Sequence, residues 1–298
     1  MNFDNTIIIP MHSQANFLMT TLKGLIRHSR LLHRILVVYS RPEVFGEAMT
    51  RDSMVRVGTL ERYQEYQSVP EVYERHTAWC DEHHIEFHDI TESCISFRRE
   101  YEAGRIYPGG IWSGGQDTAF KDNLGLRLVE TEFVVNNWDA DFYPGPGWDV
   151  HLVDVLRTYP DRRVIAMPVH VQPSPYGDMH QWTNIFEDTR HIACNRPIFP
   201  LPTDREQNQV YDHEWVAFVK KWQRQETIAE ACGVRDYLHW VPTLLRTVDA
   251  RRIGEWGYKG SGYDLEMDDR CGQLGYYKVC PRMSFIMHKG FVADEEIV

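Results

Sequence analysis

The sequence predicts a single α/β domain with a mostly parallel central sheet flanked by helices. Three observations support this. Short β-branched runs alternate with amphipathic helical patterns through the first half of the chain, no internal repeat is present, and no linker divides the sequence. Strands and helices that alternate at this interval are typical of a parallel sheet covered on both faces. A length of 298 residues is enough for one large domain of this kind.

Apolar runs rich in β-branched residues predict the strands, and apolar residues spaced three or four positions apart predict the helices. The expected strands cover residues 6–11, 35–39, 85–90, 132–138 and 164–169. The expected helices cover residues 17–26, 72–83, 118–128, 150–156 and 214–232. Between residues 241 and 290 we expect a short strand, a helix over 265–274 and two further strand-like runs.

Two stretches fit neither pattern and are expected to be loops. Residues 91–117 end in a segment rich in Gly and Tyr, and residues 170–210 are rich in Pro, His, Asn and aromatic residues. Long irregular connections in a compact domain usually carry function. Ligands of parallel sheets bind where such loops leave the carboxyl ends of the strands. We therefore expect these two loops to bind part of the substrate.

The chain is acidic, with 43 Asp and Glu against 32 Lys and Arg and a formal net charge of -11. This balance disfavours a protein whose main task is to bind a nucleic-acid backbone. The six cysteines show no paired spacing, which indicates free thiols in a reducing compartment. No signal-peptide pattern is visible, and no apolar run approaches the roughly 18 residues of a membrane span. We therefore expect a soluble, cytoplasmic protein without a transmembrane segment.

The most informative motif is a pair of carboxylates, Asp139 and Asp141, directly after the apolar strand of residues 132–138. A carboxylate pair at the end of a buried strand lies where the sheet stops and a ligand can enter. Hard oxygen donors in that position suit Mg²⁺ or Mn²⁺ bound together with substrate phosphates. A solvated turn before the Pro and Gly residues of 144–147 is the alternative explanation of the same spacing.

A second acidic group covers residues 262–270, at the start of the helix expected over 265–274. Negative charge is favoured at a helix N-terminus, and this explains Asp268 and Asp269 as surface residues. Asp264 differs because it follows a Gly-rich approach. A carboxylate in such a place could deprotonate an acceptor hydroxyl as a general base. The apolar run that ends at His288 adds a potential metal ligand near the end of the chain.

In this order, the motifs resemble the inverting nucleotide-sugar glycosyltransferases of the A-type (GT-A), family-2-like group. The opening strand and helix look like that group's first βα unit. The segment DNLGLR followed by EFVVNNWDAD resembles its helix, strand and metal-binding D-x-D motif. The block from TLLR to GYDLEMDDRCGQLGYY resembles the part that ends in its acidic catalytic motif. The resemblance covers most of the chain, with a gap at about 170–240.

The resemblance implies one Rossmann-like, nucleotide-diphospho-sugar transferase domain over residues 1–298, with a nucleotide-sugar-binding half (1–145) and an acceptor and catalytic-base half (146–298). The implied cofactor is Mn²⁺ or Mg²⁺, and a UDP-sugar is the favoured donor because it is the most frequent one. Asp264 would be the general base, or Glu266 if the register slips by two residues. The implied metal ligands are Asp139, Asp141 and His288. The implied donor-binding positions are Pro10, His12, Tyr39, Asp122 and Asp139.

Two other functions remain open at this point. A metal-dependent nucleotidyltransferase also uses paired carboxylates, but it usually has a Gly-rich, basic phosphate loop that the residues after Pro10 lack. The other is an inactive binding protein of the same fold, which would have no reason to keep Asp139, Asp141, Asp264 and His288 together. The acceptor hydroxyl is not readable from the sequence. A glycan, a lipid-linked sugar, a protein side chain or a modified nucleobase would each fit.

Overall fold

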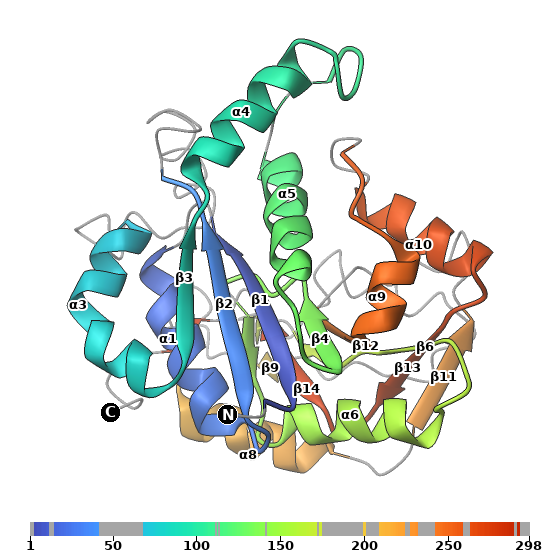
Figure 1. Ribbon diagram of the computed structural model, residues 1–298. Helices are drawn as coiled ribbons and strands as arrows, with labels where there is room; N and C mark the ends of the chain where they lie inside the picture. The colour runs from blue at the N-terminus through green and yellow to red at the C-terminus, as the bar shows by residue number, and fades with distance from the viewer. Residues whose placement is uncertain are drawn as a thin grey trace.

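A computed structural model describes most of the chain and positions the elements in space (Figure 1). The residues described are 3–11, 15–41, 68–110, 112, 114–140, 142–171, 173–174, 199–200, 209–223, 227–231, 242–258, 263–288 and 291–292. His12 and Asp141 therefore lie outside the described residues. So does most of the stretch 170–210 that the sequence predicts to be a loop.

A central sheet of eight strands confirms the predicted α/β class. Its order is β11-β13-β6-β12-β4-β1-β2-β3. The strands are β1 (Asn5–Met11), β2 (His33–Tyr39), β3 (Ile85–Asp89), β4 (Phe133–Asn136), β6 (Val164–Ala166), β11 (Thr227–Ala231), β12 (Thr243–Arg246) and β13 (Tyr277–Pro281). Strands β1 to β4 are mutually parallel, and β6 and β13 are parallel to each other. β12 is antiparallel to both β4 and β6, and β11 is antiparallel to β13. The sheet is therefore mostly parallel, as expected.

Most of the helices pack an apolar stripe against one of the two sheets. The helices are α1 (Ala15–His28), α3 (Val69–Glu82), α4 (Thr91–Glu102), α5 (Gly114–Arg127), α6 (Trp148–Thr158), α8 (Asp212–Trp222), α9 (Thr247–Ile253) and α10 (Tyr263–Gln273). Helix α5 packs on β1 and β2, and α6 packs on β6, β12 and β13. Gly125 allows α5 to approach β1 closely, because a Cβ there would lie 2.5 Å from the Ile8 side chain.

A second, three-stranded sheet has the order β5-β14-β7. It consists of β5 (Phe142–Pro144), β14 (Phe285–His288) and β7 (Val169–Val171). Two short pairs, β8 (Pro173–Ser174) with β9 (Phe199–Pro200) and β10 (Gln209–Val210) with β15 (Phe291–Val292), complete the described strands. One face of the three-stranded sheet packs on α8, where Tyr143 and Met287 join Trp215 in a separate apolar cluster.

Three predictions about the helices, strands and loops were wrong, and Asp268, expected at the surface, is buried and ion-paired with Lys278 of β13. Residues 91–117 are not all loop, because α4 forms there. Asp89 accepts hydrogen bonds from the backbone and hydroxyl of Thr91 where α4 begins. The run 164–169 divides into β6 and β7, which belong to different sheets, and Pro168 lies at the division because it has no N–H to donate. The helix expected over 214–232 ends at Trp222, and its last part forms β11, which pairs with β13.

Helix α9 was not expected, and it directly follows β12. The central sheet takes strands from both expected halves of the chain, so the division of labour between residues 1–145 and 146–298 stays a prediction. Among the described helices, none is both long and apolar enough to cross a membrane.

Candidate functional site

The site predicted from the sequence lies at the carboxyl ends of β1, β2 and β4. The parallel register of β1 and β2 aligns Pro10 with Val38 and Met11 with Tyr39. Pro10 and Tyr39, two of the predicted donor-binding residues, therefore lie at the same edge of the sheet. Pro10 is buried within β1, and Tyr39 is 9% exposed at the end of β2. In sheets of this kind, that edge is where ligands bind.

Tyr39 is the last residue of β2 and lies at this edge of the sheet. Its ring meets Phe87 edge-on at 6.5 Å, and its carbonyl accepts the N–H of Ile90. Burial, followed by the nearby carboxylate of Asp89, raises the pKa of the Tyr39 hydroxyl above its usual value. The side chain therefore stays neutral and offers a ring and a hydroxyl rather than a charge. Two residues after this strand's last residue, Arg41 is ion-paired with Asp89 at 3.0 Å.

A buried charged pair lies directly behind the end of β1. Lys121 and Asp117 of α5 are both fully buried and form an ion pair one turn apart. The Lys121 ammonium also donates to the carbonyl of Met11, the last residue of β1. The thiol of Cys94, on α4, donates to Asp117 at 3.4 Å. This network joins β1, α4 and α5 at the point where the chain leaves β1 for the first loop.

The turn that carries Asp139 is held by the core on both sides. Asn137 adopts a left-handed conformation (φ 61°), and its N–H donates to the Asp122 carboxylate at 3.4 Å. The next residue, Trp138, is fully buried. The Thr21 hydroxyl donates to the carbonyls of Ala140 and Phe142, the latter at 3.1 Å. These contacts give Asp122 a role in shaping the turn, and they fix the backbone on either side of Asp139 and Asp141.

Strand pairing brings His288 to this turn. In the antiparallel register of β5 and β14, His288 is the partner of Phe142, which directly follows Asp141 in the chain. The two rings are stacked, with centroids 4.4 Å apart and an interplanar angle of 26°. Phe142 and His288 are far apart in the sequence, so only the fold brings them together.

The donor set at this turn suits a hard or borderline divalent cation. Asp139 is half-buried on the turn and supplies carboxylate oxygens, and His288 supplies an imidazole. Within the described ranges, no three His, Cys, Asp or Glu side chains converge as a metal site. The third predicted ligand, Asp141, lies outside these ranges. Carboxylates with an imidazole fit Mn²⁺, and carboxylates alone would fit Mg²⁺ equally well.

The two candidate bases both belong to α10, which packs beside α9 on the right of Figure 1. The structure places Asp264 in the first turn of this helix and does not describe its side chain. Glu266 accepts a hydrogen bond from Arg270 at 3.1 Å. Its carboxylate also lies against Gly257, where a Cβ would be only 2.1 Å from Oε2. These contacts give Glu266 a structural role between α10 and the segment after α9.

Neither His170 nor the Lys121–Asp117 pair belongs to a motif that is recognisable in the sequence. His170 is nine-tenths buried on β7, and its ring lies 5.0 Å from that of His288. The expected strand over 164–169 ended one residue before it. Lys121 lies in the helix expected over 118–128 and Asp117 directly precedes that helix, and oppositely charged residues four positions apart are common on exposed helix surfaces. Only their complete burial distinguishes them.

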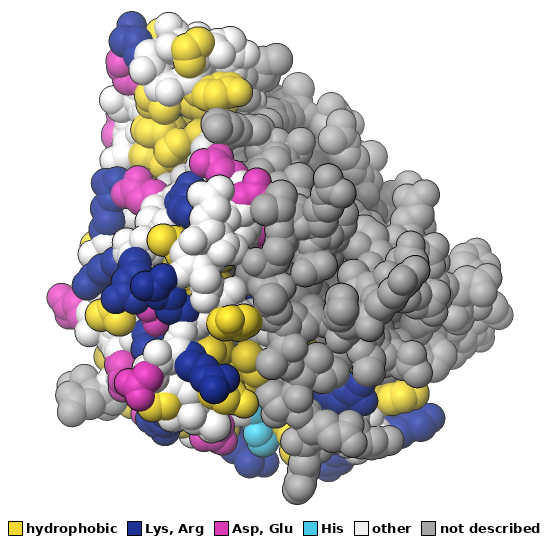
Figure 2. All heavy atoms as spheres, turned by 90° about the vertical axis from the view of Figure 1, so that its right-hand side faces the viewer, with side chains coloured by type: hydrophobic (Ala, Val, Ile, Leu, Met, Phe, Trp, Pro, Cys, Tyr) yellow, Lys and Arg dark blue, Asp and Glu magenta, His cyan; other side chains and the backbone are white. Residues whose placement is uncertain are grey.

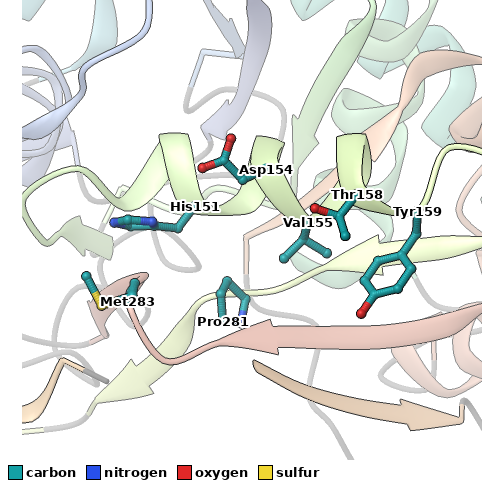
Figure 3. A pocket seen from close by; sticks show the side chains of 7 residues that line it. All are labelled: His151, Asp154, Val155, Thr158, Tyr159, Pro281 and Met283. Carbon is teal, nitrogen blue, oxygen red and sulfur yellow. The ribbon is translucent and has the colours of Figure 1, made fainter. Parts of the chain in front are cut away.

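A cavity of about 290 Å³ lies elsewhere, between α6 and the β13–β14 turn (Figure 3). Its lining includes His151 and Asp154 from α6 and Pro281 and Met283 from the turn. Burial lowers the pKa of the His151 imidazole, which is therefore neutral at pH 7. None of the predicted donor, metal or base residues lines this cavity.

No protein-family model and no curated protein sequence matches the chain. Among solved structures, the fold is similar to the crystal structure of GalNAc-T7 with UDP, GalNAc and Mn²⁺, with a TM-score of 0.52 and 10% identity. That alignment covers 98% of this chain and 45% of GalNAc-T7, so this chain spans less than half the length of that protein. The likeness shows a shared fold, the GT-A fold that the sequence motifs predicted.

A second structure, the mannosyltransferase PcManGT from Pyrobaculum calidifontis in complex with GDP-Man and Mn²⁺, aligns with a TM-score of 0.47 at 12% identity. The alignment covers 97% of this chain and 57% of that one. A score of this size does not establish a common fold.

Proposed function

We propose that this chain is a metal-dependent, inverting glycosyltransferase that transfers a sugar from a nucleoside diphosphate donor to an acceptor hydroxyl. The observation that supports this most is the pairing of β5 with β14, which brings His288 to the residue after Asp141 at the carboxyl end of β4. The fold shared with GalNAc-T7, whose structure contains UDP, GalNAc and Mn²⁺, makes the same edge the expected donor site. A UDP-sugar is the donor we favour.

In this proposal, Asp139, Asp141 and His288 hold the divalent ion, and Pro10, His12 and Tyr39 line the nucleoside side of the donor. When bound, the ion supplies a Lewis acid that neutralises charge on the diphosphate leaving group. Asp122 acts indirectly, because its carboxylate accepts a hydrogen bond from the backbone N–H of Asn137 and so holds the turn. The Lys121–Asp117 pair likewise has a structural role, because it fixes the end of β1 that leads into the first loop.

Asp264 is the proposed general base. It takes the proton of the acceptor hydroxyl while that oxygen attacks the anomeric carbon from the face opposite the diphosphate. The bond between the anomeric carbon and the diphosphate oxygen breaks in the same displacement, so the configuration is inverted. Glu266 is the second choice, because its pairing with Arg270 occupies one of its oxygens.

The acceptor is proposed to bind near the segment between α4 and α5. In Figure 1, α4 extends beyond the upper ends of β2 and β3. The turn after α4 exposes Ile106 and Tyr107, at 38% and 37% of their surfaces. Figure 2 shows apolar side chains gathered at this end of the molecule. The exposed aromatic ring in this turn is a surface on which a sugar or another apolar acceptor face can pack.

The test is a thermal-shift panel of UDP, GDP, CDP, TDP and ADP, each with and without Mn²⁺. A ligand of the folded state raises apparent stability by about 2.7 kcal/mol at a hundred times its Kd. We expect a metal-dependent shift for one diphosphate that disappears in Asp141→Asn and persists in Asp161→Asn, which removes an exposed carboxylate. No shift with any diphosphate would refute the proposal.

A further inference from the structure

A short segment after α9, residues 256–258, is held by hydrogen bonds from two helices. The first helix is α5, whose Asn123 is only 1% exposed. The amide nitrogen of Asn123 donates to the Trp256 carbonyl at 3.1 Å and to the Tyr258 hydroxyl at 2.7 Å. Its amide oxygen accepts the N–H of Trp256 at 2.7 Å. One buried side chain therefore fixes both the backbone and a side chain of this segment.

The second helix is α4, which leads to the exposed turn proposed as the acceptor surface. The hydroxyl of Tyr101 donates to the carbonyl of Tyr258 at 2.7 Å, and Tyr101 itself is 1% exposed. The ring of Tyr258 also lies 4.8 Å from that of Phe97, one turn earlier on α4. Tyr101 stacks on Tyr107, which belongs to the exposed turn, with centroids 6.3 Å apart. The segment is therefore in contact with the residues that carry the acceptor surface.

The same stretch of chain meets α10, the helix with Asp264 in its first turn. Gly257 lies so close to the Glu266 carboxylate that a Cβ would not fit. Arg270 of α10 donates to the carbonyl of Ile253 at 3.2 Å and to that of Glu255. Residues 253–258 thus join α4 and α5 on one side to α10 on the other.

Apolar packing alone does not explain these contacts. Residues 254–258 belong to no helix or strand, so their buried backbone groups need partners from elsewhere. Asn123 supplies a donor and an acceptor at the spacing that the N–H and carbonyl of Trp256 require, which an apolar side chain could not do. A few specific hydrogen bonds therefore set where α10 begins relative to α4. A displacement of about 1 Å at a reacting group can lower a rate about a hundredfold.

We propose that Asn123 is a positioning residue, and that the segment 256–258 keeps α10 at a fixed place relative to the acceptor surface on α4. This inference rests on the proposed function, and it adds to that function how the acceptor and the base are held together. Asn123 touches neither the donor nor the acceptor in this proposal. It acts only through the segment and through α10.

Hydrogen exchange of the full chain, followed by mass spectrometry, tests the link without any turnover. Asn123→Ala removes three hydrogen bonds from the segment, and Tyr101→Phe removes one. Loss of one buried hydrogen bond raises local opening by roughly two- to tenfold. Exchange in residues 256–258 and in α10 should rise by about this factor in Tyr101→Phe, and by more in Asn123→Ala.

The matched control is Thr6→Val, which also removes one hydroxyl of a buried residue. The Thr6 hydroxyl is hydrogen-bonded to that of Thr131 at 2.8 Å, near the start of β1, and has no part in the segment. This variant should leave exchange in α10 unchanged. Unchanged exchange in α10 of Asn123→Ala would overturn the proposal, and so would an equal rise in Thr6→Val.

Donor hydrolysis gives the catalytic readout, with water as the acceptor and UDP-glucose, UDP-galactose and UDP-GalNAc as probes. Asn123→Ala should lower kcat by about tenfold or more and leave the KM for the donor within about twofold, because the donor edge is built by other residues. Tyr101→Phe should lower kcat by a smaller factor, and Thr6→Val should not change it. A raised KM at an unchanged kcat in Asn123→Ala would overturn the positioning role.

The two proposals fail in different ways. If the wild-type chain binds no nucleoside diphosphate and hydrolyses no UDP-sugar, the proposed function fails, and hydrogen exchange still decides whether Asn123 holds α10. If the wild type is active and Asn123→Ala keeps its kcat, the glycosyltransferase proposal stands and the positioning role of Asn123 is refuted.

Discussion

The buried Lys121–Asp117 pair offers the most direct test of how the donor edge is built. Replacing Lys121 with Met keeps most of the length of the side chain and removes its charge. Asp117 would then stay fully buried without its ammonium partner, next to the weak thiol donor of Cys94. The carbonyl of Met11 would lose its ammonium donor as well.

The magnitude follows from the desolvation of the stranded carboxylate. Removing one partner of a buried ion pair typically costs about 3–5 kcal/mol, because an uncompensated charge stays in the interior. In a large domain each kcal/mol lowers Tm by about 2–4 °C, so Lys121→Met should lower Tm by roughly 6–20 °C. Adding Asp117→Asn removes the stranded charge. The double variant should therefore be more stable than Lys121→Met alone, with a coupling of about 0.5–3 kcal/mol.

Urea unfolding, followed by circular dichroism, measures both effects. Lys220→Met, which removes an exposed lysine of α8, is the matched control and should change stability by less than about 0.5 kcal/mol. Two results would show that the pair does not stabilise the end of β1. One is a loss of stability in Lys121→Met no larger than in Lys220→Met. The other is a double variant, Lys121→Met with Asp117→Asn, that is less stable than Lys121→Met alone.

Three further predictions address the packing, the pH dependence and the chemistry. Gly125→Ala should destabilise the fold by about 1–3 kcal/mol in chemical unfolding, because its Cβ would meet Ile8; a gain from the better helix propensity of Ala would refute the close approach. Burial opposes ionisation of Asp149, yet hydrogen bonds led by that of His33 lower its pKa below 3.8. Its contribution to stability is therefore present above that pH and lost as the pH falls through the folded pKa, so Asp149→Asn should flatten the acid limb of a stability-versus-pH curve. Asp264→Asn should bind donor and metal normally but lose sugar transfer, measured as release of the nucleoside diphosphate. Asp269→Asn is the control and should retain transfer. Normal transfer by Asp264→Asn would show that Asp264 is not the base and would make Glu266 the next candidate.

Local patterns were enough to predict much of the sheet and the place of Asp139 just after β4. β1 and β2 are continuous β-branched runs that remain buried wherever they pair, so the sequence identifies them without knowledge of their neighbours. The carboxylates after β4 could be assigned to the edge of the sheet, because the change from apolar to polar residues marks where that strand ends.

Elements whose stability depends on distant partners could not be predicted. Helix α4 buries Cys94 and Tyr101 in an aromatic cluster with Trp112 and Phe120, and that cluster exists only once α5 is in place. The last part of the expected 214–232 helix forms β11 instead, because the edge of β13 offers a complete antiparallel partner.

The sequence by itself determined the α/β class, the order of the first strands and the identity of the carboxylate motif, since these follow from the spacing of apolar residues within short segments. Only the tertiary structure decided which side chains meet at the motif. The antiparallel pairing of β5 with β14 and the parallel pairing of β14 with β7 place Phe142, His170 and His288 on one face. Such long-range pairings depend on how distant segments bury their apolar side chains together, and spacing within the sequence does not encode them.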